Sequence, residues 1–598
     1  MSVLQFMKHL FLFIFLFHIN LFCQSISPKR EFRGAWITTV GDLDWPSSNN
    51  LTSSEQQSEL ISLLDSLKAI GVNAVIFQVR SECDAMYDSP YEPWSYWLTG
   101  SQGKSPYPFY DPLEFAVKEA HRRGMELDAW FNPYRAIRTV NAYIQSKHHV
   151  TALHPDWVVK YGDSKILNPG LPQVRNYVVS VIMDVVRRYD IDGVNLDDYF
   201  YPYPKGNLKF NDDKAFKKYN YGFTNKADWR RNNVNLLIKM VHDSIKAAKP
   251  YLKFGVSPFG IWKNGVPEGI NGFSSYSKIY SDGVYWLRNH LIDYISPQLY
   301  WQFGGKQDYG KLLNWWASQL NGRHFYPSLA AYKINKLGVT ELLNQIRAGR
   351  SNPKVEGNIL FRSFDGILNN PQGFADSLQN NIYRYHALLP VMSWKDSIPP
   401  NPPVNLRYKN ISSTNKIELN WDSPSRAIDG DTAFRFVVYK FFRGNFQRKD
   451  LDATHILEVA GSNTTIVKLL TDQDQYFTVT ALDRLSNESA MSNIIHVKAF
   501  PFFSMGNMNP SLLNFEHDFT NPFDSTTKIS FELSKNSYAI IKIFDVFGRE
   551  VQPKVNKYFL SGKNIYLLET NNFPSGVYFL KLYLDRNVSY CKMIVFNE

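Results

Sequence analysis

Residues 190–202 read DIDGVNLDDYFYP, a short apolar run that ends in two adjacent carboxylates and a cluster of tyrosines. The run predicts a buried strand with Asp197 and Asp198 at its end. In a parallel α/β barrel the chemistry lies at the carboxyl ends of the strands, so acids placed there are candidates for catalysis. A helix cap or a structural ion pair is the alternative interpretation, and this stretch leaves both open.

Similar β-rich runs alternate with amphipathic helical segments from Glu31 to about Leu389. Eight such alternations can be counted in the sequence, and eight strands are the number that closes a barrel. Gly71 follows one helical segment and predicts its C-terminal cap. We expect an α/β fold, a (β/α)8 TIM barrel over residues 28–395, with strands at 32–40, 73–79, 125–131, 193–196, 253–257, 294–299, 325–330 and 358–361.

A proline-rich stretch, SIPPNPP at residues 397–403, ends the α/β pattern and predicts a stiff linker. Short alternating runs follow at 419–421, 434–439 and 476–483, spaced as in a β-sandwich. A second linker, rich in Gly, Met and Asn, precedes another β-rich unit. We therefore expect two small all-β sandwich domains after the barrel, at residues 399–498 and 510–598.

The first residues have the layout of a secretory signal peptide: Lys8 and His9, the apolar run 10–22, then Cys23. The run is too short to favour a membrane span, so we expect a cleaved signal over residues 1–24 and no transmembrane segment after its removal. Lipidation of Cys23 is the weaker alternative. With Cys83 and Cys591 as the other cysteines, no disulfide framework is expected.

The chain carries a formal net charge of +11 and 15% aromatic residues. No run of Lys and Arg occupies one helix face, so the basic balance fits an anionic cell surface at least as well as nucleic acid, and we expect no nucleic-acid partner. The aromatic content is high enough to suggest stacking surfaces, which sugar rings use. His121, His154 and His242 lack metal-ligand spacing, and we expect neither a metal nor a cofactor.

Glycosidic bond hydrolysis needs an acid that protonates the leaving oxygen. It also needs a second group, a carboxylate or the substrate's own amide, that stabilises or attacks the anomeric carbon. Alternation along the strand places Asp197 on the side of Asn195, inside the barrel if Asn195 is inside, whereas Asp198 can turn into the groove as the chain leaves the sheet. Glu82 and Asp84 follow the second strand and could supply a partner acid. The candidate catalytic residues are Asp198, Asp197, Asp84 and Glu82.

Rings, amides and guanidinium groups follow most of the other predicted strands, a mixture that suits a polyhydroxylated ligand. Packing explains any one of these positions as well, and for Arg80 an ion pair that braces the barrel mouth is an equal alternative. The candidate substrate-binding residues are Arg80, Trp130, Asn132, Tyr134, Arg135, Tyr199, Tyr201, Trp262, Gln298, Tyr300, Trp301 and Arg362.

Seven short motifs make the pattern more specific: RGAW at 33–36, DWP at 44–46, AWFNPYR at 129–135, DDYFYP at 197–202, ADWRR at 227–231, GVSPFGIW at 255–262 and PQLYW at 297–301. Over residues 31–390 the chain resembles the glycosyl-hydrolase-like 10 family. This resemblance implies a (β/α)8 glycosidase barrel. For bacterial relatives it also implies cleavage of peptidoglycan glycan strands, including strands stripped of peptides.

The two β-rich units also resemble known modules. The unit at 399–498 is similar to a fibronectin type III domain, with Trp421 as its core tryptophan. The unit at 510–598 resembles the C-terminal sorting domain of the Bacteroidetes type IX secretion route, on its motifs NPF at 521–523, TKISFEL at 527–533, DVFGREV at 545–551 and SGVYFL at 575–580. This resemblance implies a secreted or cell-surface protein that passes through the periplasm and engages the secretion machinery.

Two functions of different classes follow from these expectations. The first is a secreted glycoside hydrolase that cleaves the glycosidic bonds of a polysaccharide, above all peptidoglycan glycan strands. The second is a non-catalytic glycan-binding protein of the cell surface. The carboxylate pair favours the enzyme, because a binding protein needs only rings and hydrogen bonds.

Overall fold

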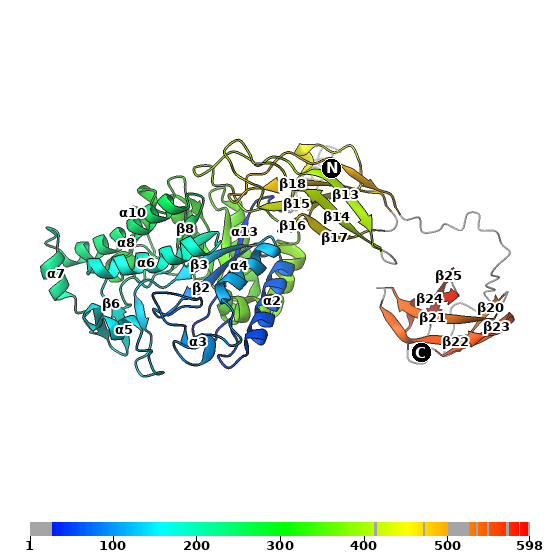
Figure 1. The fold of residues 1–598 in the computed structure, drawn as a ribbon, viewed down its shortest axis with the longest axis horizontal. Coiled ribbons are helices and arrows are strands. Elements are labelled where there is room, and N and C mark those ends of the chain that lie inside the picture. Colours follow the sequence, from blue (N-terminus) through cyan, green and yellow to red (C-terminus); the bar gives the residue numbers. More distant parts are fainter. Residues whose placement is uncertain are drawn as a thin grey trace, which may run out of the picture. The chain divides into compact units, whose positions relative to one another are not determined.

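The computed structural model describes residues 27–411, 415–470, 473–499, 526–533, 536–546, 549–569, 573–584 and 587–595. The expected signal peptide at 1–24 and the NPF motif at 521–523 lie outside the described residues. The chain divides into two compact units, Met1–Ala499 and Phe500–Glu598, each of which is described by itself (Figure 1).

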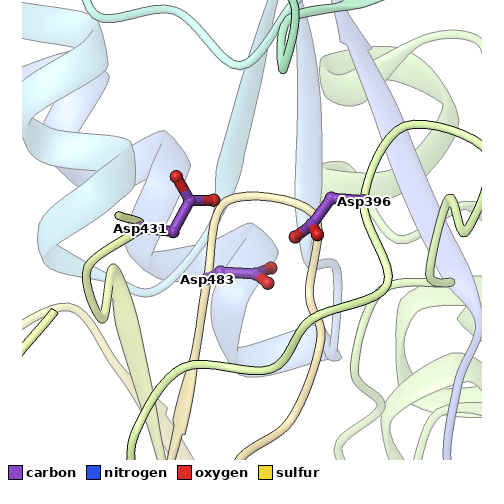
Figure 2. Close-up of side chains that lie close together, drawn as sticks. All are labelled: Asp396, Asp431 and Asp483. Atoms are coloured by element: carbon purple, nitrogen blue, oxygen red, sulfur yellow. The ribbon is translucent and has the colours of Figure 1, made fainter. Parts of the chain in front are cut away.

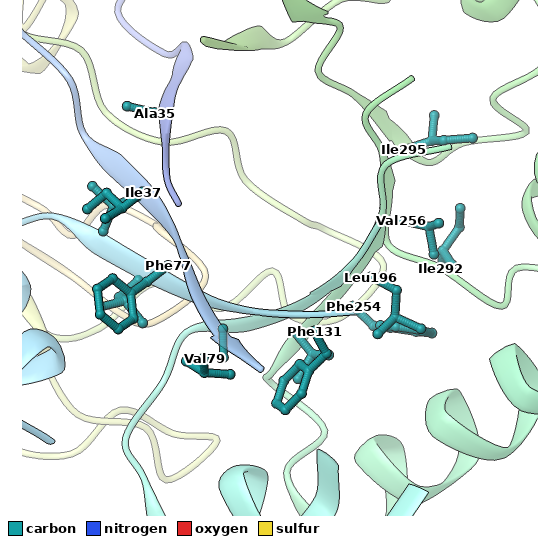
Figure 3. Packing of buried hydrophobic residues seen from close by; sticks show 14 of the residues in the cluster. Ala35, Ile37, Phe77, Val79, Phe131, Leu196, Phe254, Val256, Ile292 and Ile295 are labelled. Atoms are coloured by element: carbon teal, nitrogen blue, oxygen red, sulfur yellow. The ribbon is translucent and has the colours of Figure 1, made fainter. Parts of the chain in front are cut away.

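A curled, nine-stranded parallel sheet forms the centre of the first unit (Figures 1 and 3). Its order is β10-β9-β8-β7-β3-β2-β1-β12-β11, and only Tyr326 and Pro327 separate its two end strands in the chain. This arrangement is consistent with a TIM-like barrel. The strands are β1 (Phe32–Ile37), β2 (Ala74–Arg80), β3 (Glu126–Phe131), β7 (Gly193–Leu196), β8 (Lys253–Val256), β9 (Tyr294–Ile295), β10 (His324–Phe325), β11 (Ser328–Leu329) and β12 (Gly357–Leu360).

Each of the eight predicted strand segments overlaps a strand of this sheet, and the segment 325–330 contains the end of β10 and all of β11. The first strand is shorter than predicted and ends at Ile37 rather than Val40. The residues after it bond to side chains instead of a neighbouring strand. Thr38 N donates to Asp44 Oδ2 at 2.8 Å, and Thr39 N donates to Gln78 Oε1 at 3.0 Å.

Helices connect the strands and cover the sheet (Figure 1). The first begins with a capping box between Thr52 and Glu55 and ends at Gly71 in the left-handed conformation, with φ of 99°, which confirms the predicted cap. The helices of eight or more residues are α2 (Ser53–Ile70), α4 (Pro112–Arg122), α6 (Pro172–Arg188), α8 (Lys226–Ala248), α11 (Tyr309–Ala317) and α13 (Val339–Ser351).

Shorter elements lie in the connections. The antiparallel strands β4 (Arg135–Ile137), β6 (Ser164–Leu167) and β5 (Val158–Tyr161) form a small sheet after β3. The shorter α-helices are α3 (Tyr96–Thr99), α5 (Val150–Leu153), α7 (Asp213–Tyr219), α9 (Ser275–Lys278), α10 (Gly283–Arg288), α12 (Ile334–Leu337) and α14 (Phe374–Ser377).

The two faces of the curled sheet have different side chains, because neighbouring residues of a strand point to opposite faces. One face packs in the large core with the helices, through Ala35, Ile37, Phe77, Val79, Phe131 and Leu196 (Figure 3). The other face forms a separate, aromatic-rich cluster that includes Phe32, Trp36, Ile76, Trp130, Tyr294 and Tyr326. This inner cluster leads toward the acidic pair at the end of β7.

Seven strands in two antiparallel sheets complete the first unit. The three-stranded sheet contains β13 (Val404–Asn410), β14 (Lys416–Asp422) and β17 (Thr464–Lys468). The four-stranded sheet contains β16 (Ile456–Ala460), β15 (Arg435–Phe441), β18 (Gln475–Leu482) and β19 (Ile495–Val497). Side chains from both sheets share one core, in which Trp421, Phe436 and Phe477 are buried.

This β region lies against the amino ends of the parallel strands. Leu485, in the loop after β18, belongs to the inner cluster of the sheet together with Phe32. Arg435 Nη2 on β15 lies 3.1 Å from Glu126 Oε1, at the start of β3. Lys253 Nζ, at the start of β8, lies 2.6 Å from Glu126 Oε2. The β region therefore closes the amino end of the sheet.

The second unit is an antiparallel β domain. Its core includes Ile529, Phe531, Ile541, Ile543, Leu580 and Leu582. The strands are β20 (Thr526–Leu533), β21 (Ser537–Asp545), β22 (Glu550–Phe559), β23 (Gly562–Glu569), β24 (Gly576–Leu584) and β25 (Asn587–Val595). In the part of the chain that the structure describes, no helix is long and apolar enough to cross a membrane.

Candidate active site at the carboxyl ends of the strands

Asp197 and Asp198 leave the end of β7 and are held from opposite sides. Asp197 is 4% exposed; its Oδ2 accepts a hydrogen bond from Trp130 Nε1 at 3.1 Å. Because Trp130 belongs to the inner cluster, Asp197 faces the inside of the sheet, as the alternation predicts. Tyr199 N lies 3.3 Å from the other oxygen, Oδ1, of the same carboxyl.

Asp198 is 2% exposed and contacts the opposite side of the site. Its Oδ2 accepts a hydrogen bond from the hydroxyl of Tyr203, and the side chain of Gln298 also bonds to this carboxyl. Gln298 follows β9, and its Nε2 donates to Ser257 O at 3.3 Å. Asp197 is thus anchored toward β3, and Asp198 toward β8 and β9.

The two carboxyls differ in their affinity for a proton. Burial raises the pKa of Asp198 to about 6. Burial and then the nearby charge of Asp198 raise the pKa of Asp197 well above its ordinary value, while the Arg135 guanidinium opposes this rise. Asp197 therefore holds a proton more tightly than an ordinary aspartate, and Asp198 is ionised above about pH 6.

Arg135 connects the pair to the loop after β2. Its guanidinium lies over the ring of Tyr199, 4.4 Å from the centroid, and its Nε donates to Ser81 O at 3.1 Å. Asn132 donates to the same carbonyl oxygen, from Nδ2 at 3.2 Å. Four sequence-predicted residues, Arg135, Tyr199, Asp197 and Asp198, are thus brought together at one place.

Glu82 and Asp84 are buried in this loop, and donors of the protein occupy both oxygens of each carboxyl. Glu82 accepts from Arg138 N, from Trp97 Nε1 at 3.0 Å and from Tyr143 OH at 3.4 Å. Asp84 accepts from Ser95 Oγ at 2.7 Å and, on its other oxygen, from Ser81 Oγ and Glu82 N. Within the described ranges neither carboxyl forms a hydrogen bond with the aspartate pair. Their contacts brace the loop.

Arg80 has no exposed surface and forms a buried ion pair with Glu92, with Nη2 at 2.6 Å from Oε1. It also donates to the carbonyl oxygen of Pro133 at 3.0 Å. This is the geometry of the alternative interpretation, an ion pair that braces the mouth. Tyr134 and Tyr201 are buried as well. The side chains of these three residues lie beneath the surface that a substrate would meet, so the structure places them as supports of the site.

Partly exposed aromatic side chains follow β8 and β9 at the carboxyl end of the sheet. Tyr300 OH lies 3.2 Å from Ser328 Oγ, and its ring stacks on Phe361 with centroids 5.9 Å apart. Trp301 meets Phe259 edge-on at 5.4 Å. Together with Tyr199, which is 36% exposed, these rings offer faces on which sugars could stack.

Two of the predicted binding residues are engaged elsewhere. Trp262 stacks on Trp315 of α11, with centroids 5.6 Å apart, and its Nε1 donates to Asp282 Oδ1 at 2.9 Å. Arg362 pairs with Asp365. The structure does not join either side chain to the aspartate pair by a hydrogen bond or ring contact between described residues.

Three contacts at the site are not evident from the sequence. Tyr203 belongs to the tyrosine cluster after β7, but no pattern identifies its hydroxyl as the group that holds Asp198. Trp36 lies edge-on to Trp130 at 4.8 Å, and alternation from Phe32 could have placed it on the inner face. Ser328 accepts from Trp36 Nε1 at 3.2 Å, a contact between distant strands that no local pattern reveals.

One acidic cluster among the described residues has the spacing of a metal site, away from the aspartate pair. The carboxylate oxygens of Asp396, Asp431 and Asp483 lie within 4.8 Å of one another (Figure 2). Asn487 Nδ2 already donates to Asp483 Oδ2 at 2.8 Å and to Asp396 Oδ2 at 2.9 Å. Burial raises the pKa of Asp483 to about 6, and the contact with Asp396 adds to the rise.

Comparisons with known proteins identify the family of this chain and its export route. Residues 519–596 match a secretion system C-terminal sorting domain, of the type IX route, which indicates export to the cell surface or secretion. "Glycosyl hydrolase YngK" of Bacillus subtilis is 39% identical over 512 residues, which cover 82% of this chain and 98% of the relative. "Glycosyl hydrolase DigH" of Escherichia coli K12 is 39% identical over 378 residues, 58% of this chain and 85% of the relative.

Among solved structures, the glycoside hydrolase domain of PgaB from Bordetella bronchiseptica covers 59% of this chain and 99% of its own. It is 13% identical with a TM-score of 0.41, too low to bear on function. The family match is direct: residues 31–342 match the family described as "Glycosyl hydrolase-like 10". The strand ends and the aspartate pair lie within or beside this range, and the chain belongs to the glycosyl hydrolase-like 10 family.

Proposed function

We propose that this protein is a secreted glycoside hydrolase that cleaves glycosidic bonds of a polysaccharide by proton transfer from the pair Asp197 and Asp198. One observation carries this proposal: two buried carboxyls at the end of one strand are anchored on opposite sides and differ in proton affinity. Two carboxyls with different pKa values can divide the roles of proton donor and ionised group that acid-catalysed cleavage requires.

In this proposal the catalytic domain is a (β/α)8 TIM barrel, with the site at the carboxyl ends of its strands. A fibronectin type III-like sandwich and the sorting domain follow it, and the sorting domain engages the secretion machinery. The two sheets that share the Trp421 core support the sandwich assignment.

The proposed substrate is the glycan of peptidoglycan, including strands stripped of peptides. Three features support it: the family, the names of the bacterial relatives as glycosyl hydrolases, and the ring faces of Tyr199, Tyr300 and Trp301 near the pair. The net charge of +11 also fits work at an anionic cell surface.

Product analysis tests the proposal. The purified full chain is incubated with peptidoglycan, with peptide-free glycan strands and with a panel of plant and algal polysaccharides, and new reducing ends are measured. We expect release from peptide-free strands by the wild type and none by Asp197→Asn/Asp198→Asn. The exposed Asp213, on α7, provides the control variant Asp213→Asn. Equal release by the double variant would remove the pair from the mechanism.

A non-catalytic glycan-binding protein is the second candidate. The occupied oxygens of Glu82 and Asp84 favour it, because they leave the pair without the separate carboxylate that most glycosidases use. Tight binding of glycan strands without any release of reducing ends would identify this function.

A further inference from the structure

In the usual scheme for glycosidases, one carboxyl acts as acid and a second carboxylate acts as nucleophile or base. The site lacks an evident group for this second role. Glu82 and Asp84, the two candidates for that second role on the loop after β2, each accept three hydrogen bonds from donors of the protein, whereas Asp197 accepts two. The missing second group matters only if the protein cleaves glycans, so an inference drawn from it rests on the proposed function.

Asp197 and Asp198 do not supply both the acid and the nucleophile of the usual scheme by themselves. They leave the end of a single strand as consecutive residues, so the two carboxyls lie close together even though they are anchored on opposite sides. An acid and a nucleophile in the usual scheme flank the scissile bond from two sides. Their charges also interact, because Asp198 raises the pKa of Asp197. The pair is suited to two tasks at one edge of one sugar.

We propose that the nucleophile is the substrate's own 2-acetamido group, with Asp197 as proton donor to the glycosidic oxygen and Asp198 as acceptor of the acetamido N–H. The substrate class is then a polysaccharide with a 2-acetamido sugar on the non-reducing side of the cleaved bond. The reaction proceeds in two steps with overall retention of configuration.

In the first step the acetamido carbonyl oxygen attacks C1 and the bond from C1 to the glycosidic oxygen breaks. The proton of Asp197 passes to the leaving oxygen. The product is a bicyclic oxazolinium ion, whose N–H stays hydrogen-bonded to the carboxylate of Asp198. In the second step water attacks C1, the oxazolinium C1–O bond breaks, and the acetamido group is restored. The proton of the water returns to Asp197, and one water is consumed.

The contacts of the two carboxyls fit these roles. Asp198 is ionised above about pH 6, so its negative charge can stabilise the positive oxazolinium ion in a buried site. Tyr203 and Gln298 hold this carboxylate in place by hydrogen bonds. The raised pKa of Asp197 suits a proton donor, and the Trp130 indole N–H fixes the orientation of this carboxyl.

Asp42 is the rival nucleophile. It lies in the loop after β1, and its Oδ1 is buried with no hydrogen-bond partner among the described residues. A conventional mechanism could draw on this carboxylate, so the experiment has to include it. We expect Asp42→Asn to cleave glycan at the wild-type rate.

The decisive experiment changes the acyl group of the substrate and nothing in the protein. Peptide-free glycan strands are de-N-acetylated and then re-acylated with acetyl, fluoroacetyl or trifluoroacetyl groups. Fluorine withdraws electrons from the carbonyl oxygen and weakens it as a nucleophile. An intramolecular nucleophile contributes a large rate factor, so kcat/KM should fall at every step, by on the order of a hundredfold or more in total. Early products should retain the configuration at C1, as read by proton NMR.

The outcomes separate the two proposals. Equal rates on all three substrates, inverted products, or loss of activity in a folded Asp42→Asn would overturn the acetamido mechanism and leave the hydrolase intact. Failure to cleave any polysaccharide would overturn both. A second readout is inhibition by a thiazoline analogue of the bicyclic intermediate, which should bind the wild type and lose at least tenfold in affinity in Asp198→Asn with an unchanged melting temperature. Equal binding to both would count against the role of Asp198.

Discussion

Buried acidic side chains have different partners at the two ends of the parallel sheet. At the amino end Glu126 lies between Lys253 and Arg435, at 2.6 and 3.1 Å, and each of these charges is matched. At the carboxyl end Asp197 and Asp198 are equally buried, yet among the described residues neither forms an ion pair, and both have raised pKa values. Of these two buried acidic sites, the one without an ion pair lies at the end where reactions occur in barrels of this type.

The difference indicates how the molecule divides its tasks. A matched buried pair holds strands together and is costly to break, whereas an unmatched carboxyl is costly to form and gains its value from proton transfer. The ion pairs at the amino end stabilise the fold, and the carboxyls without ion pairs at the carboxyl end are available for catalysis. The two ends therefore have separate tasks. Substitutions at the two ends should then have opposite signatures.

The largest effect is expected at the carboxyl end. Asp197→Asn and Asp198→Asn should each lower kcat on glycan strands by about 10² to 10⁴, the usual contribution of a general acid or base. Neither should lower the melting temperature, because the amide keeps the size of the carboxyl and neither carboxyl forms an ion pair among the described residues. Loss of activity together with a fall in melting temperature would mean that the pair is structural.

The next effect belongs to the amino end. Glu126→Gln leaves Lys253 and Arg435 buried without their counter-charge and should destabilise the protein by about 3 to 5 kcal/mol. The kcat of the folded protein should stay at the wild-type value. Urea unfolding followed by tryptophan fluorescence measures the change, with the exposed Glu268→Gln as the matched control. An unchanged unfolding midpoint would show that this ion pair contributes nothing to stability.

A smaller effect should appear in the pH dependence of stability. The pKa of Asp198 rises from 3.8 in the unfolded chain to about 6 in the folded protein, so the folded state binds more protons between these values. The stabilisation from this group is fully present below about pH 4 and is lost as pH rises through 6, by at most about 3 kcal/mol. The difference in unfolding free energy between wild type and Asp198→Asn should therefore change across this window and be constant above about pH 7.

Tyr203→Phe should have the smallest effect of the four. Without the hydroxyl, the ionised form of Asp198 loses a donor, and a hydrogen bond to a charged group is worth about 1.5 to 3 kcal/mol. The acid limb of the pH–rate profile should move to higher pH by about one to two units, with kcat at the optimum reduced about tenfold or less. Rates measured from about pH 4 to 9 give both values. An unshifted limb would assign Tyr203 to packing alone.

Sequence patterns predicted those features that depend on local periodicity. The eight strand positions follow from short apolar runs, and the inward direction of Asp197 follows from its alternation with Asn195. The cap at Gly71 follows from one residue type with a known backbone preference. Each of these needs information from only a few neighbouring residues.

Contacts between distant segments could not be predicted in this way. Glu82 has the sequence context of a free acid, because Trp97, Arg138 and Tyr143 reach it from parts of the chain that no spacing rule connects. Arg80 has the context of a sugar ligand, and only the structure places Glu92 beside it. An acidic or basic residue at a strand end is a site candidate only after its neighbours in space are known.

The position of Leu485 inside the sheet has a consequence for the synthesis of the protein. Leu485 and Phe32 pack in one cluster but are separated by most of the first unit. At about 5–20 residues per second, the roughly 450 residues between them take tens of seconds to emerge. Throughout that time Phe32 and its apolar neighbours lack the cover that Leu485 provides in the folded protein. The nascent chain is therefore most susceptible to proteolysis and aggregation during this period. The period ends when the loop after β18 has been synthesised.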